Sequence, residues 1–204
     1  MTEIGLFPLD VVLLPGERIP LHVFEPRYRE LIGECLEADA PFGLILQDGE
    51  GMRGIGTLAT VTEVLERFDD GRLNIVVVGG ERFAVQGLTE GRSFTTAMVE
   101  AFDDGQEAAD PAPEDVARCL RAFRTLVEEV GAEAEQPDLT AGSLAFELAG
   151  RVAFEPGAKQ ELLELRSERA RVDVLTGMLD RAVDQVRRRS QIRERAAGNG
   201  HVEP

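Results

Sequence analysis

The stretch from Leu6 to Arg29 reads LFPLDVVLLPGERIPLHVFEPRYR, and the rest of the chain is organised around it. Two short apolar runs, 11–14 and 19–24, have the length of buried strands. Pro15-Gly16 lies between them and predicts a turn, because proline presets φ and glycine tolerates positive φ. The prolines of this stretch cannot donate a ladder hydrogen bond, so we expect its strands at sheet edges or at strand starts.

A helix is predicted to begin at Pro26, since proline lacks the N–H that would be unsatisfied at a first helical position. Apolar residues follow at helical spacing and form one stripe, which should pack on the strands: Tyr28, Leu31, Ile32, Cys35 and Leu36. Further strands are predicted at 42–46, 57–68, 73–88 and 94–102, with a loop at 47–54, a hairpin turn at Asp69-Asp70-Gly71 and a bulge at Gly79-Gly80. Short turns between most strands favour a closed or half-closed, barrel-like sheet.

The pattern changes after an acidic, proline-containing segment, 103–114, which marks a predicted domain boundary. Beyond it the apolar residues recur at helical spacing. Helices are predicted at 116–130, 144–152 and 158–165, with Glu155-Pro156-Gly157 ending the second, and Ser167 is the expected N-cap of a long last helix. The expected fold is α+β, with a β domain at 1–103, a helical domain at 114–196 that ends in the long helix, and a disordered tail at 197–204.

The block FPLDVVLLPGERIPLHVFEPRYRELI resembles the start of the substrate-recognising N-terminal domain of Lon, an ATP-dependent protease. The resemblance continues through PFGLIL, GIGTLATV, DDGRLNIVVVGGERFAV and, near the C-terminus, AKQELLE, so it covers most of the chain. It implies a PUA-like β domain followed by a helical domain. It also implies a module that binds polypeptide.

Composition narrows the function classes. The formal net charge is −16, which argues against a nucleic-acid partner. The charge is uneven, because 159–195 holds ten basic and seven acidic residues, a net +3, which leaves −19 elsewhere; we interpret this as a solvated helix. No apolar run reaches the roughly 20 residues that span a bilayer, and the N-terminus lacks a signal-peptide pattern. We therefore expect a cytoplasmic protein with no membrane partner, and its two cysteines as buried thiols.

The residue patterns of common catalytic and cofactor sites are missing from the sequence. The single lysine, Lys159, lies in AKQELLE and not in a phosphate-binding GxxxxGK[ST] loop, so no ATPase site is predicted. His22 and His201 are the only histidines, and the place of His22 on an apolar strand favours a packed or surface role over that of a catalytic base. Two separated cysteines and one usable histidine do not make a zinc site. We predict no enzyme, no cofactor and no metal.

A binding surface remains, and we place it on the PG loop, the strand after it and the start of the first helix. Apolar residues on a proline-broken edge would leave room there for an extended peptide. The candidate binding residues are Leu14, Pro15, Ile19, His22, Glu25, Arg27, Tyr28 and Arg82. Two roles stay open for Glu25 and its partner, Arg27 or Arg82: an ion pair that fixes geometry, or direct ligand contact. Three phenylalanines are expected in the core: Phe7, Phe24 and Phe83.

The favoured function is a stand-alone, non-catalytic, polypeptide-binding protein that uses this edge and the cleft against the helical half. Its predicted partner is unfolded or extended polypeptide. An adaptor or regulator of a protease machine is an alternative, and a PUA-like fold can also bind RNA or a small ligand, although the charge weighs against RNA. The oligomeric state stays open between a monomer and a weak dimer.

Overall fold

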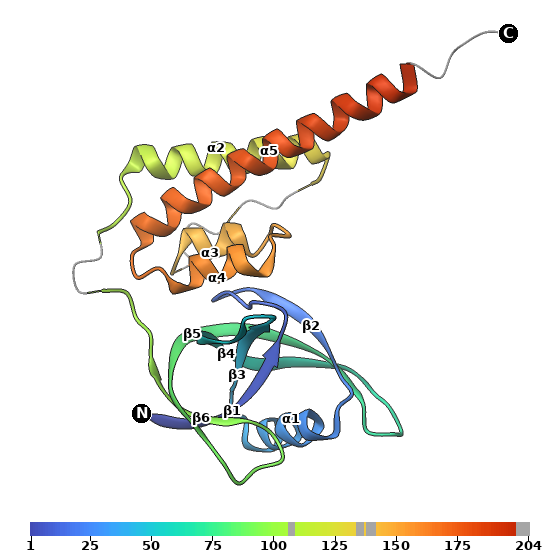
Figure 1. The fold of residues 1–204 in the computed structure, drawn as a ribbon, viewed down its shortest axis with the longest axis vertical. Coiled ribbons are helices and arrows are strands. Elements are labelled where there is room, and N and C mark those ends of the chain that lie inside the picture. The colour runs from blue at the N-terminus through green and yellow to red at the C-terminus, as the bar shows by residue number, and fades with distance from the viewer. Residues whose placement is uncertain (106–108, 134–136, 138–141, 199–204) are drawn as a thin grey trace, which may run out of the picture.

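The computed structural model describes residues 1–105, 109–133, 137 and 142–198, with backbone only for 194–198 (Figure 1). The strands are β1 (Thr2–Leu9), β2 (Arg18–Val23), β3 (Phe42–Asp48), β4 (Gly51–Arg67), β5 (Leu73–Thr89) and β6 (Thr96–Ala101). The helices are α1 (Pro26–Ala38), α2 (Pro113–Val130), α3 (Leu144–Ala149), α4 (Pro156–Glu164) and α5 (Glu168–Gly198).

The strands form one mixed sheet in the order β2-β5-β4-β3-β1-β6, and an additional β5–β6 pairing curls it toward a barrel. β1 and β3 run parallel, whereas the other neighbours are antiparallel. α1 lies at one end of the sheet, and α3 and α4 lie at the opposite end, between the sheet and the α2–α5 pair (Figure 1). The predicted α+β fold is confirmed.

Two groups of buried residues explain why the strands and α1 stay together. Tyr28, Leu31 and Ile32 of α1 pack against Phe42 and buried residues of β2 and β5. A smaller cluster on the other side of the sheet joins Leu6, Ile45, Phe83, Ala97 and Val99. The apolar stripe predicted for the first helix is therefore the surface that closes this end of the sheet.

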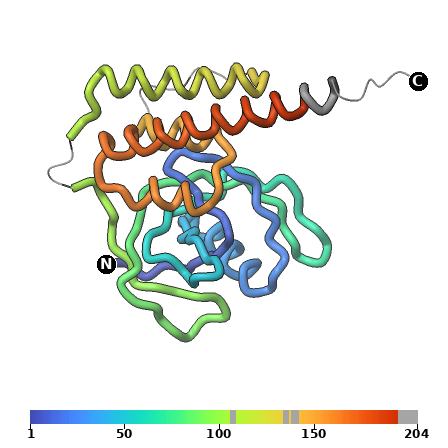
Figure 2. Tube along the Cα trace, turned by 45° about the horizontal axis from the view of Figure 1, so that its top comes forward, coloured from blue at the N-terminus to red at the C-terminus, as the bar shows by residue number. Residues whose placement is uncertain are grey.

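The helical half has its own buried core, built from the apolar faces of α2, α3, α4 and α5. α2 and α5 lie side by side and run in the same direction (Figure 2). Exposed ion pairs join them near both ends, Arg118 with Asp173 at 3.3 Å and Arg187 with Glu129 at 2.8 Å. α5 continues beyond the end of α2 (Figure 1).

Several local predictions are confirmed. The hairpin turn lies at Asp69-Asp70-Gly71, with Gly71 at φ 86°. The bulge in β5 is real, because Gly80 and Glu81 together face the single residue Leu58 of β4. Proline occupies the first turn of α1, and α5 begins directly after Ser167.

Other local predictions are wrong. The run 11–14 is not a strand; the first strand is Thr2–Leu9. Residues 47–54 form a tight hairpin instead of a loop, in which the Glu50 N–H donates to Asp48 at 2.9 Å. Pro156 opens α4 and does not end α3, which stops at Ala149. α5 reaches Gly198, so the predicted tail at 197–204 starts as helix, and 199–204 lie outside the described residues.

Candidate functional site

A cleft of about 440 Å³ lies between the sheet and the helices. Pro15 and Gly16 of the PG loop and Gly79 to Arg82 of the β5 bulge line it on one side. The start of α3 and Arg171 of α5 line it on the other, and the segment 102–104 after β6 completes it. Phe102 and Phe146 give the cleft aromatic walls.

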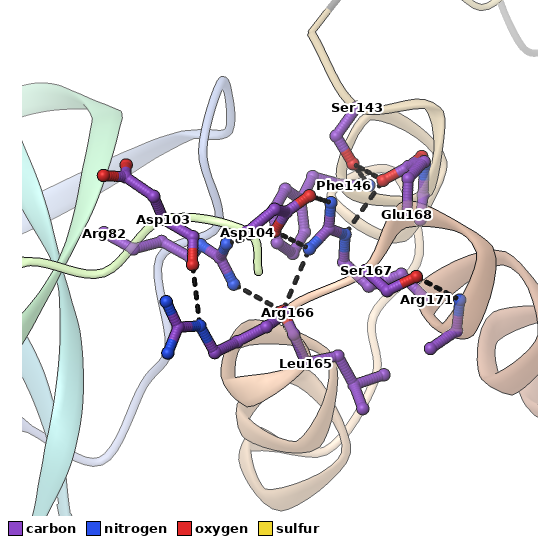
Figure 3. A network of polar contacts seen from close by, with 12 residues as sticks. Arg82, Asp103, Asp104, Ser143, Phe146, Leu165, Arg166, Ser167, Glu168 and Arg171 are labelled. Carbon is purple, nitrogen blue, oxygen red and sulfur yellow. Dashed lines mark hydrogen bonds and ion pairs between the residues drawn. The ribbon is translucent and has the colours of Figure 1, made fainter. Parts of the chain in front are cut away.

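A network of charged side chains lines this cleft, and we call its members Arg82, Asp104 and Arg171 the floor of the cleft (Figure 3). Arg82 comes from β5 and Arg171 from α5, and their side chains are 6% and 3% exposed. Both donate to Asp104: Arg82 through one bond of 2.6 Å and Arg171 through two, each 2.6 Å. The Arg171–Asp104 pair is bidentate, the geometry that suits a guanidinium and a carboxylate.

The two arginines have further acceptors that hold them in place without Asp104. Arg82 donates to the carbonyl oxygens of Leu163 and Leu165 at 2.8 and 2.6 Å. Arg171 donates to the Leu165 carbonyl at 2.9 Å and to Glu168 at 2.8 Å. These bonds tie the sheet, the α4–α5 connection and α5 into one unit.

The surroundings shift the pKa values of this network in opposite directions. The hydrogen bonds from Arg171 are the largest reason that the pKa of Asp104 is lowered. Burial lowers the pKa of Arg82, and the neighbouring charge of Arg171 lowers it further. Burial also acts to lower the pKa of Arg171, but bonds to Asp104 and Glu168 outweigh it and the pKa is raised.

The PG loop is anchored to the helical half and is not a free edge at Leu14. Leu14 is fully buried in the helical core, and its N–H donates to Glu17 at 3.0 Å. Glu17 also pairs with Lys159 of α4, and both side chains are largely buried. The expectation that Leu14 lies exposed on an edge is therefore wrong, because Val12 and Leu14 pack into the core of the helical half, while Leu13 packs into the core that the sheet shares with α1.

β2 ends the sheet and pairs with β5 alone among the described residues. The Gly79 N–H donates to the Glu17 carbonyl at 2.9 Å, so Glu17 and Gly79 are a hydrogen-bonded pair. Hydrogen-bonded and non-hydrogen-bonded pairs alternate along an antiparallel ladder. Ile19, Leu21 and Val23 therefore bond to β5. The backbone groups of Arg18, Pro20 and His22 point away from it, and we call them the β2 edge.

An exposed aromatic cluster lies at the far end of β2. Phe24 is 58% exposed, against the expectation that it is core, and its ring stacks on His22 at 5.8 Å between centroids. His22 also meets the edge of Phe68 at 6.2 Å. The His22 Nδ1 shares a 2.6 Å hydrogen bond with the Asn74 side chain. We call Phe24, His22 and Phe68 the aromatic cluster.

The remaining candidate residues fall into different surroundings. Glu25 pairs with Arg27 at 2.9 Å, with both side chains at least 40% exposed, and not with Arg82. Tyr28 is buried and stacks on Phe7 at 4.1 Å, so it belongs to the core. Ile19 is half-buried on β2. The sequence set thus divides between the cleft (Pro15 and Arg82), the core (Leu14 and Tyr28), and the β2 strand with the start of α1 (Ile19, His22, Glu25 and Arg27).

Sequence reasoning missed the partners of Arg82. Its ion-pair partner Asp104, and Arg171 and Glu168, which extend the network from Asp104, are distant from it along the chain, and no local motif marks them. Glu168 also accepts hydrogen bonds from Ser143 and from the Ala145 N–H at 2.7 and 2.9 Å, at the start of α3. Within the described residues no group of three or more His, Cys, Asp or Glu side chains could hold a metal ion.

Comparison with known families shows to which family the chain belongs. The family model described as the substrate-binding domain of ATP-dependent protease La (LON) matches residues 3–181. The chain belongs to this family. Lon proteases of Paraburkholderia phytofirmans and Xanthomonas oryzae pv. oryzae are each 26% identical to it over 93% and 96% of its length. The chain spans about a quarter of the length of the curated relatives that it matches.

Solved structures of Lon N-terminal domains share the fold. The Lon N-terminal domain protein from Xanthomonas campestris matches with a TM-score of 0.67 and 24% identity, over 87% of this chain and 98% of the other. The N-terminal domain of Lon protease from the Mycobacterium avium complex matches with a TM-score of 0.65 and 18% identity, over the same shares. None of the described helices of this Lon-family chain is long and apolar enough to cross a membrane.

Proposed function

We propose that this Lon-family chain is a non-catalytic module that binds unfolded or extended polypeptide by adding a strand to the β2 edge. The family assignment supports polypeptide as the class of ligand. The observation that most directly supports this location is the edge of β2 that no described strand pairs with, which offers backbone groups in a row.

The β2 edge has the chemistry that strand addition needs. The N–H groups of Arg18 and His22 are outward donors, and the carbonyls of Arg18, Pro20 and His22 are outward acceptors. Pro20 removes the middle donor, which weakens indiscriminate edge-to-edge pairing while leaving two donors for a ligand. Main-chain bonds of this kind do not depend on the ligand's sequence, as the recognition of many unfolded chains requires.

The aromatic cluster adds an apolar contact at the end of the edge. Phe24 exposes 58% of its surface to solvent, and an exposed apolar ring beside a free strand is stabilised when a ligand side chain covers it. The edge and the cluster together fit a strand of at least five residues that carries an apolar side chain near one end. Our second proposal, based on the Lon relatives, is that the chain acts with a protease. In that role the same surface would deliver polypeptide to the partner protease.

A matched pair of substitutions tests the proposed function. Phe24→Asp should weaken the binding of fluorescently labelled, reduced casein by roughly tenfold or more, because the carboxylate must be desolvated in the complex. Leu88→Asp is the control, since Leu88 is 59% exposed but lies on β5 away from β2. Equal affinities for both variants in fluorescence anisotropy would contradict the proposed site, provided that both variants melt near the wild-type temperature.

A further inference from the structure

We propose that Arg82 and Arg171 form a binding site for the C-terminal carboxylate of a polypeptide, and that Asp104 occupies this site in the free protein. The inference extends the proposed function, since its natural ligand is a polypeptide. It rests on a different part of the molecule, the floor of the cleft (Figure 3).

The two guanidinium groups are arranged as a receptor. Each side chain is more than nine-tenths buried and is oriented by acceptors other than Asp104, namely the carbonyls of Leu163 and Leu165 and the carboxylate of Glu168. Three donor atoms then converge on one carboxylate from two directions. A preorganised pair of guanidinium groups binds any carboxylate that reaches it, because little ordering is left to be done.

Asp104 is the most exposed member of this network. Its side chain is 34% exposed, against 6% and 3% for the arginines, and it reaches the site from the segment after β6. Asp104 is therefore the member of the network that solvent and a dissolved carboxylate reach most easily. An incoming carboxylate takes the same donors when Asp104 swings toward solvent.

Because of the negative charges around the cleft, a ligand carboxylate must replace Asp104 and does not bind beside it. Glu81, Asp103 and Glu147 also line the cleft, and Glu168 contacts Arg171 from α5, so a second anion beside Asp104 would be repelled. The site holds one carboxylate at a time. A tethered side chain competes like a ligand at about millimolar concentration, which makes wild-type affinity weak and the Asp104-free site stronger.

The apolar residues that line the cleft favour a ligand whose carboxylate is attached to an apolar residue. Pro15, Phe102 and Phe146 present apolar surface beside the arginines. A polypeptide ending in an apolar residue places a carboxylate and an apolar side chain within one residue of each other. Pro15 and Gly16 lead directly into β2, so a polypeptide paired antiparallel to β2 has its C-terminus at the cleft end.

The first test uses acetate and needs no polypeptide. In Asp104→Ala, sodium acetate exchanged for chloride at constant ionic strength should raise the melting temperature saturably, by about 3 °C or more. The wild type and the neighbouring Asp103→Ala variant should show no such gain. An Asp104→Ala protein that responds to acetate no more than to chloride would overturn the proposal, and this outcome leaves polypeptide binding at the β2 edge untouched.

The second test identifies the source of the carboxylate and covers the case in which Asp104→Ala does not fold. One apolar peptide is prepared as the free acid, as the amide, and as the amide with an internal aspartate, and each is titrated against wild type and Asp104→Asn. The free acid should bind Asp104→Asn roughly tenfold more tightly than the plain amide, with a smaller preference in wild type. Equal binding of free acid and amide by both proteins contradicts the proposal, and so does a preference for the internal aspartate.

Discussion

Replacing Arg82 with alanine should destabilise the fold far more than replacing Arg27, although both arginines belong to the set that the sequence singles out. The Arg82 side chain is 6% exposed and donates to two carbonyl oxygens and to Asp104. Its removal leaves the Leu163 carbonyl without this donor and leaves the Leu165 carbonyl and Asp104 with bonds from Arg171 alone. Losing a buried guanidinium together with its three hydrogen bonds costs about 3–5 kcal/mol.

Arg27 is the matched control, because its pair with Glu25 has a similar distance but 47% and 40% exposed side chains. Exposed pairs contribute about 0–1 kcal/mol. For a chain of this length the melting temperature should fall by about 10 °C in Arg82→Ala and by no more than about 3 °C in Arg27→Ala. Urea unfolding followed by far-UV circular dichroism gives the free energies, and losses below about 1 kcal/mol in both variants would refute the reasoning.

Three further outcomes are expected. Leu14→Asp should lose more than about 5 kcal/mol of folding free energy, as measured by urea unfolding, because it opens a cavity and buries a carboxylate; a stable variant would place Leu14 outside the core. Gly79→Ala should cost about 2 kcal/mol, since its Cβ would lie 2.1 Å from the Leu14 carbonyl oxygen, whereas Gly87→Ala, with open space, should melt like wild type. The lowered pKa of Asp104 gives stability that is complete above its unfolded pKa of about 3.9 and is lost as pH falls through the folded pKa. Asp104→Asn should therefore lose less stability than wild type as the pH falls below about 5, and an unchanged slope of stability against pH would contradict this.

Local signals in the sequence predict much of the fold. Turn chemistry marks the hairpin at Asp69-Asp70-Gly71, where Gly71 has a positive φ that few residues adopt. Gly79-Gly80 marks the bulge, and Gly79 lies too close to the Leu14 carbonyl oxygen for a residue with a side chain. Helical spacing and Pro26 locate α1 in the same way. The resemblance carried by the PG block supplies the family, which the family model confirms.

Two kinds of feature escape this reasoning. The run 11–14 has the apolar content of a strand, but Val12 and Leu14 pack into the core of the helical half while Leu13 packs into the core of the sheet and α1, and only the tertiary structure separates these uses from a strand. The charged floor of the cleft joins Arg82, Asp104 and Arg171, whose meeting depends on how β5 and α5 are placed and not on any neighbouring residue. The exposure of Phe24 is likewise a consequence of where β2 ends.

Amide-resolved hydrogen exchange on the β2 edge tests the central claim most directly. In the free protein the outward N–H groups of Arg18 and His22 should exchange quickly, whereas those of Ile19 and Leu21 are protected by β5. Saturating, reduced casein should slow exchange at Arg18 and His22 and leave the inner pair unchanged. Bound casein that leaves the exchange of Arg18 and His22 unaltered would contradict strand addition at this edge.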